Sequence, residues 1–159
     1  MNGRETLRRR MAPMTTSPND ADRARVDDFL HEDLTRRIIG CYYAVGRKLG
    51  PGYLESVYKR ALGIELARAK CSCAFEAPLD VFYDGIGVGR FFADLIVENA
   101  VIVELKASSA LVEADKKQLI NCLSCTNIEV GLLFQFGAKR TFERVVFSNQ
   151  NKEMLRQHS

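Results

Sequence analysis

Two strongly apolar segments joined by a short turn, residues 87–97 and 101–107, constrain this 159-residue chain more than any other feature. If the turn is centred on Asn99, residues whose numbers sum to 198 lie opposite each other on antiparallel strands, and Asp94 then faces Glu104. Side chains alternate between the two faces of a strand, and both faces here are mostly apolar, which is typical of central strands covered on both sides. The pattern therefore predicts two carboxylates brought together inside a sheet.

Facing carboxylates repel each other, and their removal from water makes the arrangement costlier still. A lysine neutralises one of them, whereas a divalent cation neutralises both, and hard oxygen donors on two strands suit magnesium or manganese. Lys106 shares a face with Glu104, where it can orient or activate a water and stabilise negative charge on a phosphate. The competing interpretation is a surface hairpin in which Glu104 and Lys106 are solvated.

The remaining periodicity predicts a mixed α/β fold. Helical spacing of apolar residues predicts two helices, interrupted by Gly50-Pro51-Gly52, because proline and glycine stop a helix. Strand-like segments follow, with one further helix among them. The expected order is ααβββαββ, a mixed central sheet flanked by helices, with helices at 26–49, 53–69 and 110–124 and strands at 73–83, 87–97, 101–107, 128–136 and 141–147.

Length and composition predict one domain, over residues 26–150, between two tails. Residues 1–25 are expected to form a disordered basic tail, in which Met11 and Met14 are alternative starts, and residues 151–159 a C-terminal tail. The first 26 residues account for the whole net charge of +3, so the body is neutral. A neutral body does not grip long nucleic acid by charge alone, and any such role requires a localised site.

Five cysteines without a secretory signal predict a reducing compartment and a cytoplasmic location. A zinc site built from two pairs, Cys71 with Cys73 and Cys122 with Cys125, is the alternative. One pair begins a predicted strand and the other ends a predicted helix, so buried or free thiols explain them better. The second pair also lies late in its helix, whereas reactive thiols favour a helix start. No apolar run approaches the ~20 residues of a membrane-spanning helix.

The spacing of Asp94 and Glu104-Leu105-Lys106 resembles the core of PD-(D/E)xK nucleases. Gly52, Glu55 and Tyr58 resemble the signature that names the GxxExxY family, whose members are regarded as nucleases of that superfamily. The resemblance runs from about residue 30 to residue 147. It implies a restriction-endonuclease-like α/β core.

The resemblance also implies roles for individual residues. Asp94 and Glu104 would bind Mg²⁺ or Mn²⁺, and Lys106 would assist catalysis. Glu55 would add a further acid to the site, and Gln118 would lie beside Lys106. Without the resemblance, a favourable helix dipole explains Glu55 and an exposed helix face explains Gln118.

Taken together, these features predict a magnesium-dependent nuclease that hydrolyses DNA or RNA with a metal-activated water, and no membrane partner. The alternative is a catalytically degenerate nuclease-fold protein that acts as a binding or assembly module, with a homodimer left open. The neutral body favours this alternative, as do departures from the family pattern. Histidine is usual at Gly46 and near Asp115, tyrosine at Cys122 and asparagine at Gln135.

Overall fold

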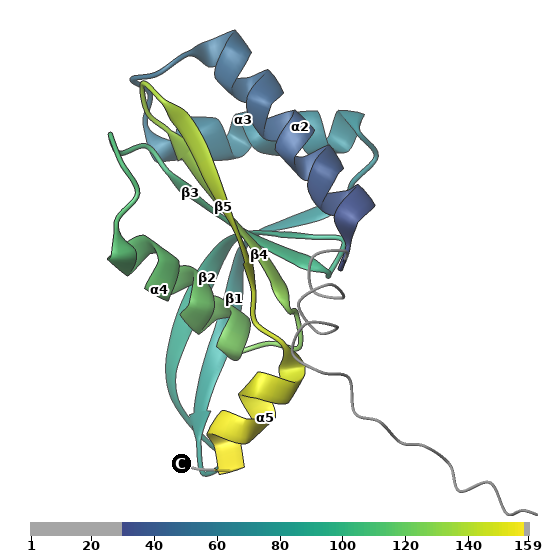
Figure 1. Cartoon of the computed structure of the whole chain (residues 1–159), viewed down its shortest axis with the longest axis vertical. Coiled ribbons are helices and arrows are strands. Elements are labelled where there is room, and N and C mark those ends of the chain that lie inside the picture. The colour runs from purple at the N-terminus through teal and green to yellow at the C-terminus, as the bar shows by residue number, and fades with distance from the viewer. Residues whose placement is uncertain (1–29, 158–159) are drawn as a thin grey trace, which may run out of the picture.

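Five strands form one mixed sheet in the order β1-β2-β3-β4-β5 (Figure 1). The computed structural model describes residues 30–157, so the predicted tail over 1–25 lies outside the described residues. Only β3 and β4 run parallel, and every other neighbouring pair is antiparallel. The strands are β1 (Cys73–Tyr83), β2 (Ile86–Val97), β3 (Val101–Lys106), β4 (Val130–Phe136) and β5 (Arg140–Val146).

Helices cover both faces of this sheet. Helices α2 (Glu32–Leu49) and α3 (Glu55–Arg68) pack on one face, and α4 (Glu113–Ser124), which connects the parallel strands, packs on the other (Figure 1). The mixed α/β class and the order ααβββαββ are confirmed. Among the described residues, no helix combines the length and the apolar character that crossing a bilayer requires.

One further helix, α5 (Asn149–Gln157), occupies most of the stretch expected to be a C-terminal tail. Its sequence is strongly polar, and its two apolar residues, Met154 and Leu155, are adjacent, so helical spacing of apolar residues did not predict it. The first turn of the helix makes polar contacts with the body of the protein. The buried Lys152 ammonium donates hydrogen bonds to the carbonyls of Thr126 and Ile128, at 3.0 and 2.6 Å. The backbone N–H of Asn149 donates to the Glu129 carboxylate.

Stacked aromatic rings join the α2–α3 layer to β4. Tyr42 stacks on Phe134 and Tyr58 stacks on Phe136, each with ring centroids 4.3 Å apart. Every residue of β4 is buried, as expected for a strand in the middle of a sheet with helices on both faces. The aromatic pairs fix where α3 lies relative to the sheet.

The glycine-rich turn between α2 and α3 is fastened by Tyr58. Its buried hydroxyl donates to the carbonyl of Gly50 at 2.7 Å and accepts from the N–H of Tyr53 at 3.2 Å. Gly50 and Gly52 have φ of 71° and 103°, in the region that glycine occupies without strain. Gly52, the first residue of the Gly52–Glu55–Tyr58 signature, therefore shapes the turn, and Tyr58, the last residue, packs against the sheet and holds the turn in place.

The β2–β3 hairpin has the predicted register. Leu95 pairs with Val103, Ile96 with Ile102 and Val97 with Val101, so partners sum to 198. The turn is closed by Glu98 and Asn99, with φ of 52° and 51°.

Replacing Tyr58 with Phe should lower the free energy of unfolding by about 1–2 kcal/mol, because the turn loses both of its hydrogen bonds to the hydroxyl. Urea denaturation measures this loss. Tyr83→Phe is the matched control, since that tyrosine is 65% exposed at the end of β1 and should tolerate the change. Equal midpoints for the two variants would contradict the fastening role of Tyr58.

Candidate functional site

Asp94 lies where β2 loses regular pairing on both sides. On one side the β1–β2 pairs pass from Phe75–Leu95 to Ala77–Ala93, without a pair between them at Asp94. On the other side the β2–β3 pairs end at Leu95–Val103. Glu76, across from Asp94 on β1, has a left-handed φ of 47°. The backbone therefore opens around the carboxylate.

The Asp94 side chain occupies this opening and bridges two layers of the fold. Its Oδ2 accepts a hydrogen bond of 2.9 Å from the backbone N–H of Leu105, so the side chain replaces a missing ladder contact. Its Oδ1 accepts from the Lys59 ammonium of α3 at 2.7 Å. Lys59 also pairs with Glu76. One cation thus neutralises Asp94 from the α3 side.

Glu104, the second carboxylate, is more deeply buried and has no cation in direct contact among the described residues. It is 1% exposed, and its Oε1 lies 3.4 Å from the backbone nitrogen of Asp94. Gln118 of α4 donates to its Oε2 at 3.2 Å, and the Cys122 thiol lies 3.6 Å from Oε1. Burial and the neighbouring Asp94 charge raise the pKa of Glu104 to about 8.

Gln118 connects Glu104 with Lys106. While its nitrogen donates to Glu104, its Oε1 accepts a hydrogen bond of 3.0 Å from the Lys106 ammonium. Asp115, one turn earlier on α4, lies 3.7 Å from the same ammonium. Lys106 is therefore held on the face that carries Glu104, at the end of β3.

Four of the five candidate residues gather in this way, and Glu55 does not contact them. Within residues 30–157, its carboxylate makes no hydrogen bond or ion pair, although it begins α3 one turn before Lys59. Lys59 is the contact that sequence analysis did not identify. Lys59 lies four residues after Glu55, so the two residues share a face of α3. This spacing is the one sequence feature that could have indicated Lys59 as part of the site.

The cysteine pairs lie on opposite sides of the sheet, which argues against a shared zinc site. Cys71 and Cys73 pack in the α2–α3 layer, whereas Cys122 lies on α4 and Cys125 directly follows that helix, on the other face of the sheet. Burial and the nearby Glu104 raise the pKa of the Cys122 thiol to about 12, so this thiol stays protonated near neutral pH.

Two of the departures from the family pattern make structural contacts. A side chain at Gly46 would collide with Arg140, whose guanidinium donates to the Gly46 carbonyl at 3.0 Å. Gln135 is buried, and its amide joins the Ser108 carbonyl to the Thr141 hydroxyl. Both residues therefore stabilise the strands around Lys106 without touching the carboxylates.

The donor atoms suit a hydrated hard cation better than a fully protein-bound one. Across the described residues, no group of three or more His, Cys, Asp and Glu side chains is arranged to hold a metal. Magnesium commonly binds through only one or two carboxylates and keeps several waters. Asp94 and Glu104 match that requirement in kind and number.

Comparison with protein families identifies a match over most of the chain. The family model described as the PD-(D/E)XK nuclease superfamily matches residues 32–145, which include all five candidate residues. The searches of curated proteins and of solved structures gave no significant match.

The raised pKa of Glu104 predicts that metal-free protein loses stability as pH rises. The folded state holds this proton up to about pH 8, whereas an unfolded glutamate releases it near its ordinary value, ~4.3. The stabilising contribution is complete below the unfolded pKa and is lost as pH rises to about 8. Urea denaturation in EDTA at several pH values measures this, and Glu104→Gln should flatten the dependence. A parent profile as flat as the variant's would contradict a buried, protonated Glu104.

Proposed function

The chain belongs to the PD-(D/E)XK nuclease superfamily, whose model matches well over half of its residues, and from this premise we propose that it is a metal-dependent nuclease. The reaction is hydrolysis of phosphodiester bonds in DNA or RNA. Within the superfamily we assign it to the GxxExxY family, a proposal supported by Gly52, Glu55 and Tyr58 at the start of α3. A cytoplasmic location, which the cysteines predict, is part of this proposal.

One observation carries the proposal: the carboxylates of Asp94 and Glu104 are buried side by side, with Lys106 held next to them through Gln118. A structural role alone gives no reason to bury two acidic groups together, because an apolar pair would fold at lower cost. A carboxyl group with a perturbed pKa beside a fixed ammonium, as Glu104 is here, is typical of catalytic sites.

The proposed mechanism assigns a task to each of these residues. Asp94 and Glu104 would hold Mg²⁺ or Mn²⁺, which would supply Lewis-acid chemistry for the attacking water and the phosphate. Lys106 donates hydrogen bonds to a phosphate oxygen and stabilises the charge that develops there. Gln118 fixes the direction of Lys106 and of Glu104 at once. Glu55 remains a proposed further acid, one helical turn before Lys59 on α3.

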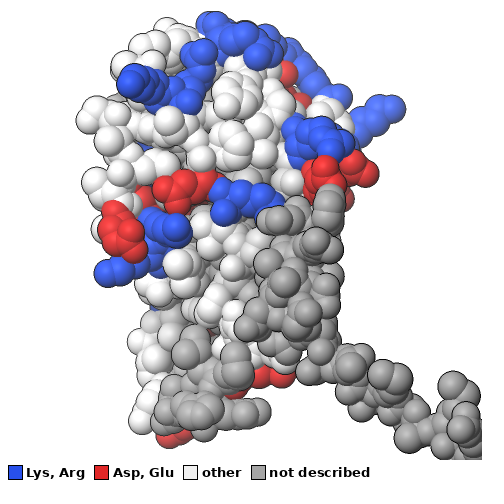
Figure 2. Space-filling model, in the orientation of Figure 1, with Lys and Arg blue, Asp and Glu red and all other residues white. Residues whose placement is uncertain are grey.

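The surface beside Asp94 supports nucleic acid as the substrate. A cavity of about 370 Å³ between α3 and β1 is lined by Ser56, Lys59, Arg60, Phe75 and Glu76, and Lys59 connects it to Asp94. Together α2 and α3 carry seven Lys and Arg against four Asp and Glu. Basic side chains gather toward that end of the molecule (Figure 2). The body of the protein has no net charge, so nucleic acid binding requires a locally basic surface, and the α2–α3 end provides one.

Lys59 should compete with the metal ion for the Asp94 carboxylate. A variant that removes the charge of Lys59 tests this competition. Lys59→Met leaves Asp94 without its ion pair. The free energy of unfolding of the metal-free protein should therefore fall by about 1–3 kcal/mol, which lies between the costs of breaking an exposed ion pair and a fully buried one. Added Mn²⁺ should then raise the melting temperature more in the variant than in the parent, since no ammonium has to be displaced.

Lys48→Met, which removes an exposed ion pair with Glu65, is the control and should leave the response to Mn²⁺ unchanged. If Lys59→Met gains no more from Mn²⁺ than the parent does, Asp94 is not a ligand that Lys59 blocks.

Cleavage of plasmid and oligonucleotide substrates in Mg²⁺ tests the nuclease proposal. Asp94→Asn and Lys106→Met should each lower the rate by about 100-fold or more, because each removes charge needed at the phosphate. Lys116→Met is the matched control on α4, where that lysine is half-exposed and pairs with Glu143.

Equal cleavage by all variants would refute the assigned site. A rise in melting temperature with Mg²⁺ but no cleavage by the parent would instead support the degenerate binding module.

A further inference from the structure

The distal part of the β1–β2 hairpin exposes large apolar side chains that nothing in the chain covers within the described residues. Beyond Pro78 on β1 and up to Phe92 on β2, only one apolar residue, Leu79, is fully buried. The exposed members are Phe82, Tyr83, Ile86, Val88, Phe91 and Phe92, with exposed fractions from 37% to 68%. Because side chains alternate along a strand, Phe82 and Phe91 lie on one face of the hairpin. The opposite face carries Tyr83, Ile86, Val88 and Phe92, which are called the arm surface here.

The arm surface supplies a substantial part of what a stable interface needs. A large side chain presents on the order of 150–250 Å² when fully accessible, so four side chains that are more than half exposed present roughly 400 Å². That area is as large as the largest apolar patch on many monomers, roughly 300–600 Å². It is about half of the ~800 Å² that each partner contributes to a standard interface.

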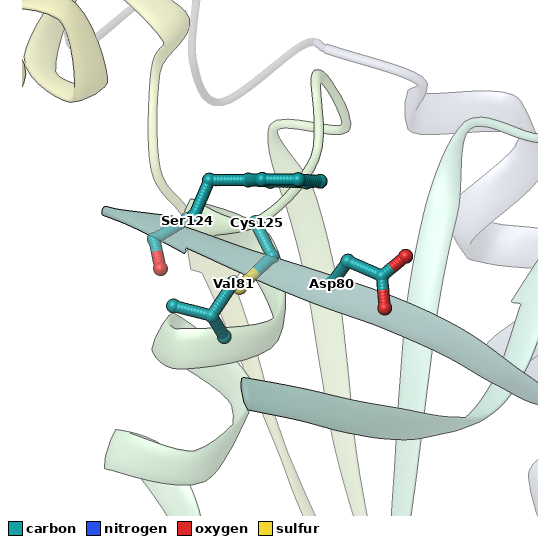
Figure 3. A pocket seen from close by; sticks show the side chains of 5 residues that line it. Asp80, Val81, Ser124 and Cys125 are labelled. Carbon is teal, nitrogen blue, oxygen red and sulfur yellow. The ribbon is translucent and has the colours of Figure 1, made fainter. Parts of the chain in front are cut away.

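The arm also stands away from the body and leaves a hollow beneath it. A cavity of about 450 Å³ is lined by Asp80, Val81 and Phe82 of β1 and by Ser124 and Cys125 at the end of α4. Figure 3 shows Asp80 and Val81 passing across the end of α4, where Ser124 and Cys125 lie. The hollow has room for a large side chain supplied by another molecule.

The charge of the β1–β2 arm indicates which class of molecule binds it. Residues 73–92 carry Glu76, Asp80 and Asp84 against Arg90, and Arg90 is already paired with Asp80 at 2.5 Å. A net negative arm repels nucleic acid phosphates and anionic lipid, in contrast to the basic α2–α3 end. An apolar surface with few unpaired charges is typical of contacts between identical subunits.

We propose that the arm surface binds the arm surface of a second copy of this chain, forming a two-fold symmetric dimer. The two arms pack through their apolar side chains, and tip side chains of each copy enter the hollow of the other. Pairing of two β1 edges does not form this contact, because Pro78 lacks an N–H and interrupts the free edge of β1. A two-fold axis makes the patch complementary to itself.

The test is the mass of the full chain in solution, measured by light scattering and sedimentation over a concentration series. The parent should have twice the mass of one chain. Ile86→Lys and Val88→Lys, both at exposed arm positions, should each shift the protein to one-chain mass at the same concentration. The matched control is Ile64→Lys, since Ile64 is 55% exposed on α3 and far along the chain from the arm. Circular dichroism establishes that each variant is folded.

A parent with one-chain mass throughout the series would overturn the proposal, as would arm variants that remain dimeric like Ile64→Lys. Loss of single-stranded oligonucleotide binding by the arm variants of a monomeric parent would assign the arm to nucleic acid instead. None of these outcomes depends on cleavage activity, so the dimer and the nuclease proposal fail or succeed separately.

Discussion

The structure depends on one unfavourable contact, the burial of Asp94 and Glu104 side by side between β2 and β3. The contact costs solvation for both groups and repulsion between them, and the surrounding residues offset this cost in different ways. Asp94 pairs with the Lys59 ammonium and accepts a hydrogen bond from the Leu105 N–H. Burial instead raises the pKa of Glu104, so this carboxyl remains protonated near neutral pH without a cation. The two acids therefore occupy different environments although they are neighbours.

The same contact explains why the site draws on so many elements of the fold. Because the ladder opens around Asp94, its side chain can reach both the backbone of β3 and Lys59 of α3. The neighbouring Glu104 and Lys106 are joined by Gln118 of α4, from the other helical layer. The aromatic stacking of Tyr58 on Phe136 holds α3 against the sheet one residue away from Lys59. Packing in the core thus determines where the cation that balances Asp94 lies.

Much of this arrangement follows from the sequence, and the exceptions have physical causes. The register of β2 and β3 follows from the turn and from apolar alternation, which leave little freedom once both faces are buried. The link between Gln118 and Lys106 needed the family resemblance, because helical spacing alone leaves an exposed face equally reasonable. Lys59 was missed because a lysine on a helix surface carries no local signal of its distant partner. Helix α5 was missed because its two apolar residues are adjacent and form no helical pattern, whereas Lys152 and Asn149 make contacts with distant residues that carry no local signal.

A manganese soak of crystals, with anomalous diffraction to locate the ion, tests the central claim most directly. The account predicts one strong peak about 2 Å from a carboxylate oxygen of both Asp94 and Glu104, with the Lys59 ammonium moved away from Asp94. An empty site in which Lys59 still pairs with Asp94, or an ion bound by other residues, would contradict it.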